Sequence, residues 1–329
     1  MLKPRLLLPL LAMFAVASIV FALFAGSADL GGPAVWHALA GNEGGTGARI
    51  VRELRLPRAL AAFVVGGLLS LAGALMQVLL RNPLADPYVL GVSGGAAVAA
   101  LGTMLAGLGA FWVSANAFAG ALVSMLLVFG LAHGRGGWTP TRLLLTGVVV
   151  AAGWGALTTF MLAVSPDRNL RGMLFWLMGD LAHTSGPGWS IGLLALGLLT
   201  AFALARPLNL LARGDLQAQA LGVPVRPLRI VVYALASLLT GAAVTLAGTV
   251  GFVGLVVPHM LRLVGGADHR WLLPGSVLGG GALLVLADAL ARVLIAPQQL
   301  PVGVITALIG VPLFLFLLHR GPRTGRSPA

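Results

Sequence analysis

Residues 206–229, RPLNLLARGDLQAQALGVPVRPLR, form the longest polar interval in an otherwise apolar chain. Gly214 and Asp215 can begin a short helix inside it, and Gly222 can end that helix. A helix of one or two turns is not stable alone in water, so it needs a membrane surface or a partner protein. The spacing alone leaves two interpretations open: an interfacial loop helix, or the place where a cytosolic motor protein binds a membrane pore.

The composition on either side of this interval is that of a membrane protein. Hydrophobic residues make up 58% of the 329 residues and charged residues only 9%, whereas soluble domains are about 25% charged. Glycine occurs 46 times, which suits close helix packing in a bilayer. The chain has no cysteine, which excludes disulfides and thiolate chemistry. These features predict an all-α polytopic membrane protein.

A helical span needs about 20 apolar residues, and the sequence offers ten candidates. The expected spans are residues 6–26, 59–80, 89–107, 111–132, 143–164, 189–205, 228–250, 251–265, 272–296 and 302–318. The first has an apolar run longer than that of a typical signal peptide. With ten spans, both termini and residues 206–229 are cytoplasmic, and most of the 21 basic residues also lie inside, as the positive-inside rule requires.

Seven basic residues depart from this charge bias, and Arg55, Arg58 and Arg292 are among them. Arg55 and Arg58 lie at the outer end of the second expected span, and Arg292 lies at the outer end of the ninth. An acidic partner outside the membrane would explain them. Snorkelling to lipid phosphate is the alternative, and Asp288 can also pair with Arg292 one turn later on a helix.

The chain lacks the sequence motifs of phosphate-loop nucleotide binding and of zinc-dependent hydrolysis. It has no GxxxxGK[ST] or HExxH sequence, and its six histidines show no metal-ligand spacing. We therefore expect no enzyme activity, no metal and no cofactor. The expected spans are poor in ionisable residues, which disfavours an ion-coupled carrier. Energy for transport would then come from a separate ATPase.

A proline-rich interruption, NPLADP at residues 82–87, separates the second and third expected spans. Broken backbone at membrane depth is tolerated only where protein or a water-filled cavity receives its polar groups. The segment is therefore either part of a transport pathway or an ordinary cytosolic turn. A second interruption, residues 138–142, is expected on the same side.

A series of short motifs follows in order from about residue 52 to residue 318. They are RLPR at 55–58, GALMQ at 73–77, NPLADPYVLGVSGGA at 82–96, LRGMLFWLMGD at 170–180, the GD…A…LGV pattern at 214–223, GFVGLVVPHMLR at 251–262, DHRWLLPG at 268–275, LADALAR at 286–292 and LPVGVITALIGVPLF at 300–314. This series resembles the FecCD permeases, the membrane subunits of ATP-binding-cassette (ABC) importers for iron chelates, haem and cobalamin. Within that family, the series resembles the cobalamin permeases in particular, including LRGMLFWLMGD at 170–180.

The resemblance implies a type II importer fold of about ten transmembrane helices with an inverted repeat, forming a single permease domain over residues 1–329. It also implies a homodimer in the bacterial inner membrane, with a pore on the two-fold axis. Two cytoplasmic ATPase subunits and a periplasmic substrate-binding protein would complete the assembly, with no nucleic acid partner. The substrate would be cobalamin or a ferric siderophore, less so haem. The alternative is an ion-coupled secondary carrier that works without an ATPase.

The resemblance also assigns roles by position. The coupling helix that meets the ATPase would include Gly214, Asp215, Leu216, Ala218, Leu221 and Gly222. Docking of the binding protein would use Arg55, Arg58 and Arg292. The cytoplasmic gate would include Asn82, Leu84 and Thr141. Pro140 departs from the hydroxyl-bearing residue that the family pattern has beside this gate.

Overall fold

The computed structural model describes residues 4–26, 30–41, 45–133, 139–182, 184 and 186–320, and all regular structure within them is helical. Residues 1–3, 134–138 and 321–329, which include part of the second interruption and basic residues near both termini, lie outside this description. The elements in chain order are α1 (Pro4–Phe24), α2 (Gly32–Leu39), α3 (Gly45–Ile50), the π-helix η1 (Val51–Arg55), α4 (Leu56–Leu79), the 3₁₀ turn η2 (Pro87–Leu90), α5 (Val92–Leu105), α6 (Ala110–Ala132), α7 (Pro140–Val164), α8 (Asp167–Met178), α9 (Ser190–Ala203), α10 (Ala205–Leu211), α11 (Asp215–Ala220), α12 (Val225–Ala247), α13 (Val253–Gly265), α14 (His269–Val293) and α15 (Val302–Arg320).

The apolar helices fall where the hydropathy of the sequence predicts spans. Six are long and apolar enough to cross a membrane: those within residues 6–24, 45–79, 110–132, 140–164, 225–247 and 269–293. The pair α9 and α10, bent by 61° at residue 204, is a seventh candidate, and three further apolar helices are shorter. Each of the ten expected ranges overlaps one of these elements. The second begins earlier than expected, because α3, η1 and α4 form one continuous helix of 35 residues.

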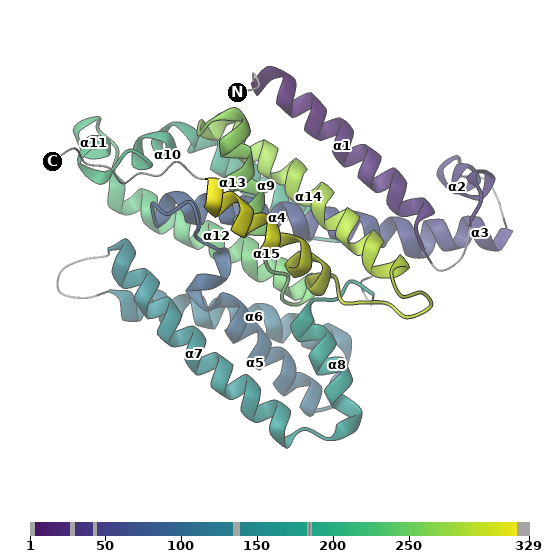
Figure 1. Cartoon of the computed structure of the whole chain (residues 1–329). Coiled ribbons are helices and arrows are strands. Elements are labelled where there is room, and N and C mark those ends of the chain that lie inside the picture. The colour runs from purple at the N-terminus through teal and green to yellow at the C-terminus, as the bar shows by residue number, and fades with distance from the viewer. Residues whose placement is uncertain are drawn as a thin grey trace.

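The chain repeats one pattern of helices in opposite directions. A long helix, a break and a short helix occur as α4 and α5 (24 and 14 residues) and again as α12 and α13 (23 and 13 residues). The long helices α6 and α14 follow, and each packs on its short predecessor and on the opposite repeat's first helix. Because α4 starts beside α3 and α12 starts beside α11, at opposite ends of the molecule (Figure 1), the two repeats are inverted.

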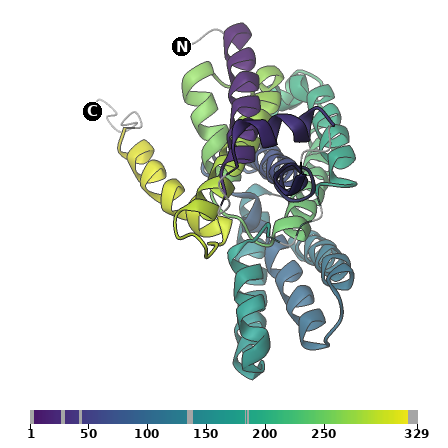
Figure 2. The ribbon, with the colours of Figure 1, turned by 90° about the vertical axis from the view of Figure 1, so that its right-hand side faces the viewer.

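Two ends of the molecule can be distinguished from this arrangement. The helices α10 and α11 lie at one end, where α1 begins and α15 ends, and the helices α2 and α3 lie at the other (Figure 1). Seen from the side, α5, α6 and α7 form a group that stands apart from α1, α14 and α15 (Figure 2). We call the α10–α11 end the inner end and the α2–α3 end the outer end.

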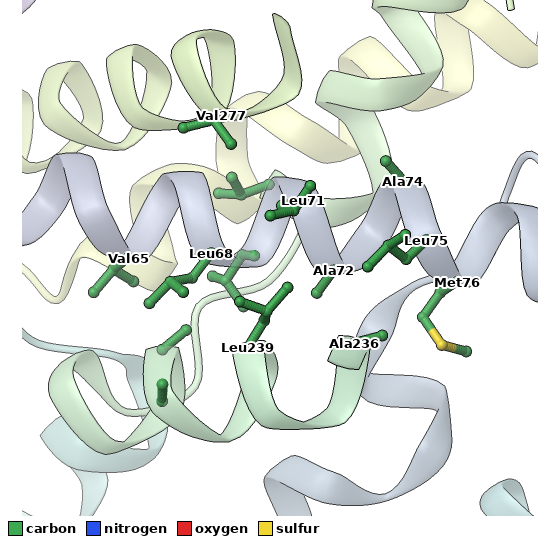
Figure 3. Packing of buried hydrophobic residues seen from close by; sticks show 14 of the residues in the cluster. Val65, Leu68, Leu71, Ala72, Ala74, Leu75, Met76, Ala236, Leu239 and Val277 are labelled. Carbon is green, nitrogen blue, oxygen red and sulfur yellow. The ribbon is translucent and has the colours of Figure 1, made fainter. Parts of the chain in front are cut away.

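Helix α4 is the centre of the core. Its side chains pack on one side against Leu239 and Ala236 of α12 and on the other against Val277 of α14 (Figure 3). Small residues allow such close packing: a Cβ on Gly66 would collide with the carbonyl oxygen of Gly280 on α14, and one on Gly73 with that of Gly254 on α13. Dispersion contacts and close backbone approach, rather than exclusion from water, therefore hold the membrane-embedded core together.

Candidate functional site

The polar interval that opened the sequence forms a short helix with glycine at both ends. The backbone of Gly214 has φ +121° and that of Gly222 has φ +80°, values that glycine adopts without steric cost. Ala218 is buried against the rest of the protein. By contrast, Leu216 is 83% exposed and Leu221 is 64% exposed. The structure thus brings the six expected coupling residues together and leaves an apolar surface on α11 uncovered.

This helix is fastened to the core by its first residue. The carboxylate of Asp215 accepts hydrogen bonds from Nη2 of Arg229 on α12, at 2.7 Å from each carboxylate oxygen. The side chain of Arg81, at the end of α4, lies 3.8 Å from the same carboxylate. Asp215 therefore ties α11 to two long helices of opposite repeats.

A second polar junction holds α10. The side-chain amide of Asn209 donates to Asp268 at 2.8 Å, and its oxygen accepts from the backbone N–H of His269 at 2.9 Å. These residues cap and begin α14. These contacts join α10 and α11 to α12, α14 and the end of α4.

The expected gate residues lie at the same end of the molecule. The side-chain oxygen of Asn82 accepts from the backbone N–H of Leu84 at 2.9 Å, which closes a turn directly after α4. Thr141 lies exposed in the first turn of α7, which Thr139 caps by accepting from the N–H of Arg142 at 3.3 Å. We call residues 82–86 the gate segment. Helix α7 reaches the η2 turn that follows this segment, since a Cβ on Gly147 would collide with the carbonyl oxygen of Val89.

The break between α4 and α5 contacts the matching break between α12 and α13. The hydroxyl of Tyr88 accepts a hydrogen bond from the backbone N–H of Val250 at 3.0 Å. Asp86 accepts from the N–H of Tyr88 at 2.8 Å, and burial raises the pKa of Asp86 to about 6. A side chain of the first interruption therefore satisfies a backbone N–H of the second, as broken backbone in a membrane protein requires.

At the outer end, two of the three expected docking arginines, Arg55 and Arg292, meet at the end of α1. Arg55 donates to the carbonyls of Leu23 and Phe24, both at 2.8 Å. Arg292 donates to the carbonyl of Ala25 at 2.9 Å and pairs with Asp288 at 3.2 Å. The last carbonyls of a helix have no partner within the helix, so the arginines cap α1.

Arg58 completes this outer cluster. Its Nη2 lies 2.8 Å from a carboxylate oxygen of Asp288, and its Nη1 donates to Gln299 at 2.8 Å. Asp288 is almost fully buried, whereas Arg58 remains partly accessible. The sequence indicated the pairing of Asp288 with Arg292, but it gave no signal for the capping of α1 or for the bond to Arg58. The cap joins Arg55 to Phe24, 31 positions away, and the bond joins Arg58 to Asp288, 230 positions away. Neither contact is local in the sequence.

In the part of the chain that the structure describes, no three His, Cys, Asp or Glu side chains come together as metal ligands do. The geometry is that of a helical membrane protein with an anchored apolar loop helix at one end and an arginine cluster at the other. The sequence model of the FecCD transport family matches residues 13–320.

The chain belongs to the FecCD transport family. Two curated members show how far the similarity extends. The hemin transport system permease HmuU of Yersinia pestis is 41% identical and aligns over 97% of this chain and 96% of its own length. The cobalamin import system permease BtuC of Halobacterium salinarum is 45% identical over 82% of this chain and 73% of its own length.

A solved structure supports the FecCD fold. The inward-facing structure of a metal-chelate type ABC transporter has a TM-score of 0.83 and 30% identity, covering 97% of this chain and 100% of that one. The expected membership and the type II importer permease fold are thereby confirmed. The family is one of transport permeases, in agreement with the expectation that this chain is not an enzyme.

Proposed function

We propose that this FecCD permease is the membrane subunit of an ATP-driven importer that carries a metal chelate from a periplasmic binding protein to the cytoplasm. The observation that carries the proposal is the pair of exposed leucines, Leu216 and Leu221, on an otherwise anchored helix. An exposed apolar patch framed by polar residues is typical of a protein interface. An ATPase bound there would supply the energy that the chain itself cannot.

The location follows from the same proposal. The inner end, with α10, α11, the start of α1 and the end of α15, faces the cytoplasm of a bacterial inner membrane. The ten apolar elements then cross the bilayer as one permease domain. Asn82, Leu84 and Thr141, which lie toward the ATPase side, form the cytoplasmic gate.

The outer cluster supports docking of an acidic partner. Three guanidinium groups, on Arg55, Arg58 and Arg292, meet at this end together with one carboxylate, that of Asp288. Arg58 is the most accessible of the three, so we propose it as the main contact. Arg55 and Arg292 then support the docking surface by holding the end of α1.

The uncovered surface of α7 supports a homodimer. Only Leu143 and Gly147 of this helix are buried, although the helix is about as apolar as α6. Leu145, Val149 and Phe160 all lie exposed on it. A second copy that packs on α7 would place a pore on the two-fold axis. A cysteine introduced at Val149 should then give a disulfide-linked dimer, whereas a monomer in lipid would stay uncrosslinked at low protein density.

The transported chelate is proposed at the level of its class. The similarity to a hemin permease over 97% of this chain and to a cobalamin permease over 82% supports both ligands, and a ferric siderophore is the third candidate. The absorption spectrum of the pigment bound to the cognate periplasmic protein separates these three. Corrin, haem and hydroxamate-iron chromophores absorb differently.

The deciding experiment is reconstitution in liposomes. The permease, co-purified with its cytosolic ATPase, should hydrolyse ATP faster when loaded binding protein is added outside. Uptake driven by a proton or sodium gradient without any ATPase would instead establish the ion-coupled carrier. Absence of any stimulation by the loaded binding protein would overturn the importer.

A further inference from the structure

Arg81 occupies an unusual backbone conformation for its residue type. It directly follows the end of α4, and its φ of +49° lies in the left-handed region. Its N–H donates to Val78 at 3.1 Å and the N–H of Asn82 donates to Gln77 at 3.1 Å, which is the pattern that ends helices with a left-handed residue. Glycine fits this position without steric cost, whereas arginine does not. The side chain therefore needs a role that outweighs the backbone strain.

That side chain points to the coupling helix. Its Nη2 lies 3.8 Å from Oδ2 of Asp215, and both side chains are partly exposed. The same oxygen lies 2.7 Å from Nη2 of Arg229, whose side chain is almost fully buried. The bond to Arg229 is thus short and shielded, while the contact with Arg81 is longer and open to solvent. Of the two, the contact with Arg81 is the one that can break and form again.

The gate segment starts at the very next residue. Asn82 follows Arg81 and closes its turn on the N–H of Leu84 at 2.9 Å. Because this turn is closed by its own hydrogen bond, a change in the backbone of Arg81 would move residues 82–84 together. A movement of α11 would reach them through the side chain of Arg81.

We propose that Arg81 is a positioning residue that links the coupling helix to the gate. Its contact with Asp215 breaks and forms again as access to the pore alternates between the two sides of the membrane. This inference rests on the proposed function, because it requires an ATPase that moves α11. The alternative is that Arg81 only neutralises charge at the end of α4. The two differ in what happens when the arginine is replaced by glycine.

Arg81→Gly is the informative variant because glycine is the residue that suits the backbone best. The variant should fold, so any loss of coupling comes from the side chain. The chain has no cysteine, so Leu84→Cys provides a single reporter in the gate segment. The measurement is its rate of labelling by a membrane-impermeant maleimide, in the complex with ATPase, without nucleotide and with ATP plus vanadate.

In the Leu84→Cys parent, the labelling rate should change with the nucleotide state. Addition of Arg81→Gly should reduce that change by about two- to fivefold, the range expected for a partly exposed ion pair. Asp215→Asn should reduce it as well, and combining the two should add little, since residues that act through one contact are not additive. Arg226→Ala, which removes an exposed arginine from the first turn of α12, is the matched control and should leave the change intact.

An unaltered nucleotide response in Arg81→Gly, with a responsive parent, overturns the link and leaves the importer function standing. Full additivity of Arg81→Gly and Asp215→Asn overturns it as well. If the parent neither retains an ATPase on purification nor responds to nucleotide, the proposed function fails and the link falls with it. The three results are distinguishable in one set of samples.

Discussion

The carboxylate of Asp288 on α14 accepts hydrogen bonds from Arg58 on α4, 230 residues away in the sequence. The same carboxylate pairs with Arg292 one turn later on its own helix. Asp288 is 1% exposed, so it neutralises two neighbouring positive charges where water has little access. This arrangement makes Asp288 the residue on which the outer cluster depends.

Replacement of Asp288 by asparagine should therefore destabilise the protein. Asparagine keeps the size and one acceptor oxygen but leaves Arg58 and Arg292 without a counter-charge. Removing one partner of a buried ion pair costs about 3–5 kcal/mol, which should lower the midpoint of thermal unfolding in detergent by several degrees. Glu53→Gln is the control, because its pair with Arg49 is exposed on both sides and such pairs contribute little. Equal midpoints for the two variants would contradict the structural role of Asp288.

Leu216→Asp should prevent assembly with the ATPase without affecting the permease itself. The side chain of Leu216 is uncovered in the isolated subunit, so a carboxylate there costs no core packing, but it would face the apolar contact of a partner. Co-purification with the ATPase is the measurement, with size-exclusion chromatography to show that the permease is folded. Gln219→Asp introduces the same charge at another exposed position of α11, and it should retain more of the ATPase. Retention of the partner by Leu216→Asp would remove this surface from the interface.

Gly73→Ala should disrupt the junction between the two repeats. A methyl group at this position would collide with the backbone carbonyl of Gly254, and backbone cannot yield as a flexible side chain can. Overpacking of a tight core typically costs about 1–3 kcal/mol. Gly130→Ala in α6 is the control, because a Cβ there meets nothing within 4 Å, and alanine favours the helix by about 0.5–1 kcal/mol. Similar thermal midpoints for both variants would show that α4 and α13 pack less closely than described.

The sequence predicts the helices of this protein well but not which of them form its core. Hydropathy predicts both α4 and α7 as spans, yet most of α4 is buried, whereas only Leu143 and Gly147 of α7 are buried. Lipid and protein interior are both apolar, so composition alone cannot distinguish a central helix from one that awaits a partner. The arginine cluster illustrates a similar limit. The order of the expected spans placed Arg55, Arg58 and Arg292 at the outer end, against the charge bias, whereas the acceptors of Arg55 and Arg292 at the end of α1 depend on the tertiary fold.

The coupling helix was easier to predict because its signals are local. Glycine at both ends, an acidic first residue and a following proline define α11 within ten positions. The contact of Asp215 with Arg81 was not visible in the sequence, since the two residues are more than 130 positions apart. Likewise, α2, α3 and α8 were not expected, because each is too short or too polar to register as a span.

The last prediction concerns the outer surface and uses Arg58→Gln. Glutamine removes one positive charge while Asp288 keeps its pair with Arg292, so the stability should fall less than in Asp288→Asn. Affinity for the periplasmic binding protein should fall at low ionic strength. The difference from the unmodified permease should shrink as salt is added, because exposed charges are screened within about 10 Å at 0.1 M. Arg49→Gln is the matched control, since it removes an arginine that is exposed at the same end and paired with Glu53. An affinity that is unchanged by Arg58→Gln at low salt would show that the arginine cluster serves only to hold α1 against α4 and α14.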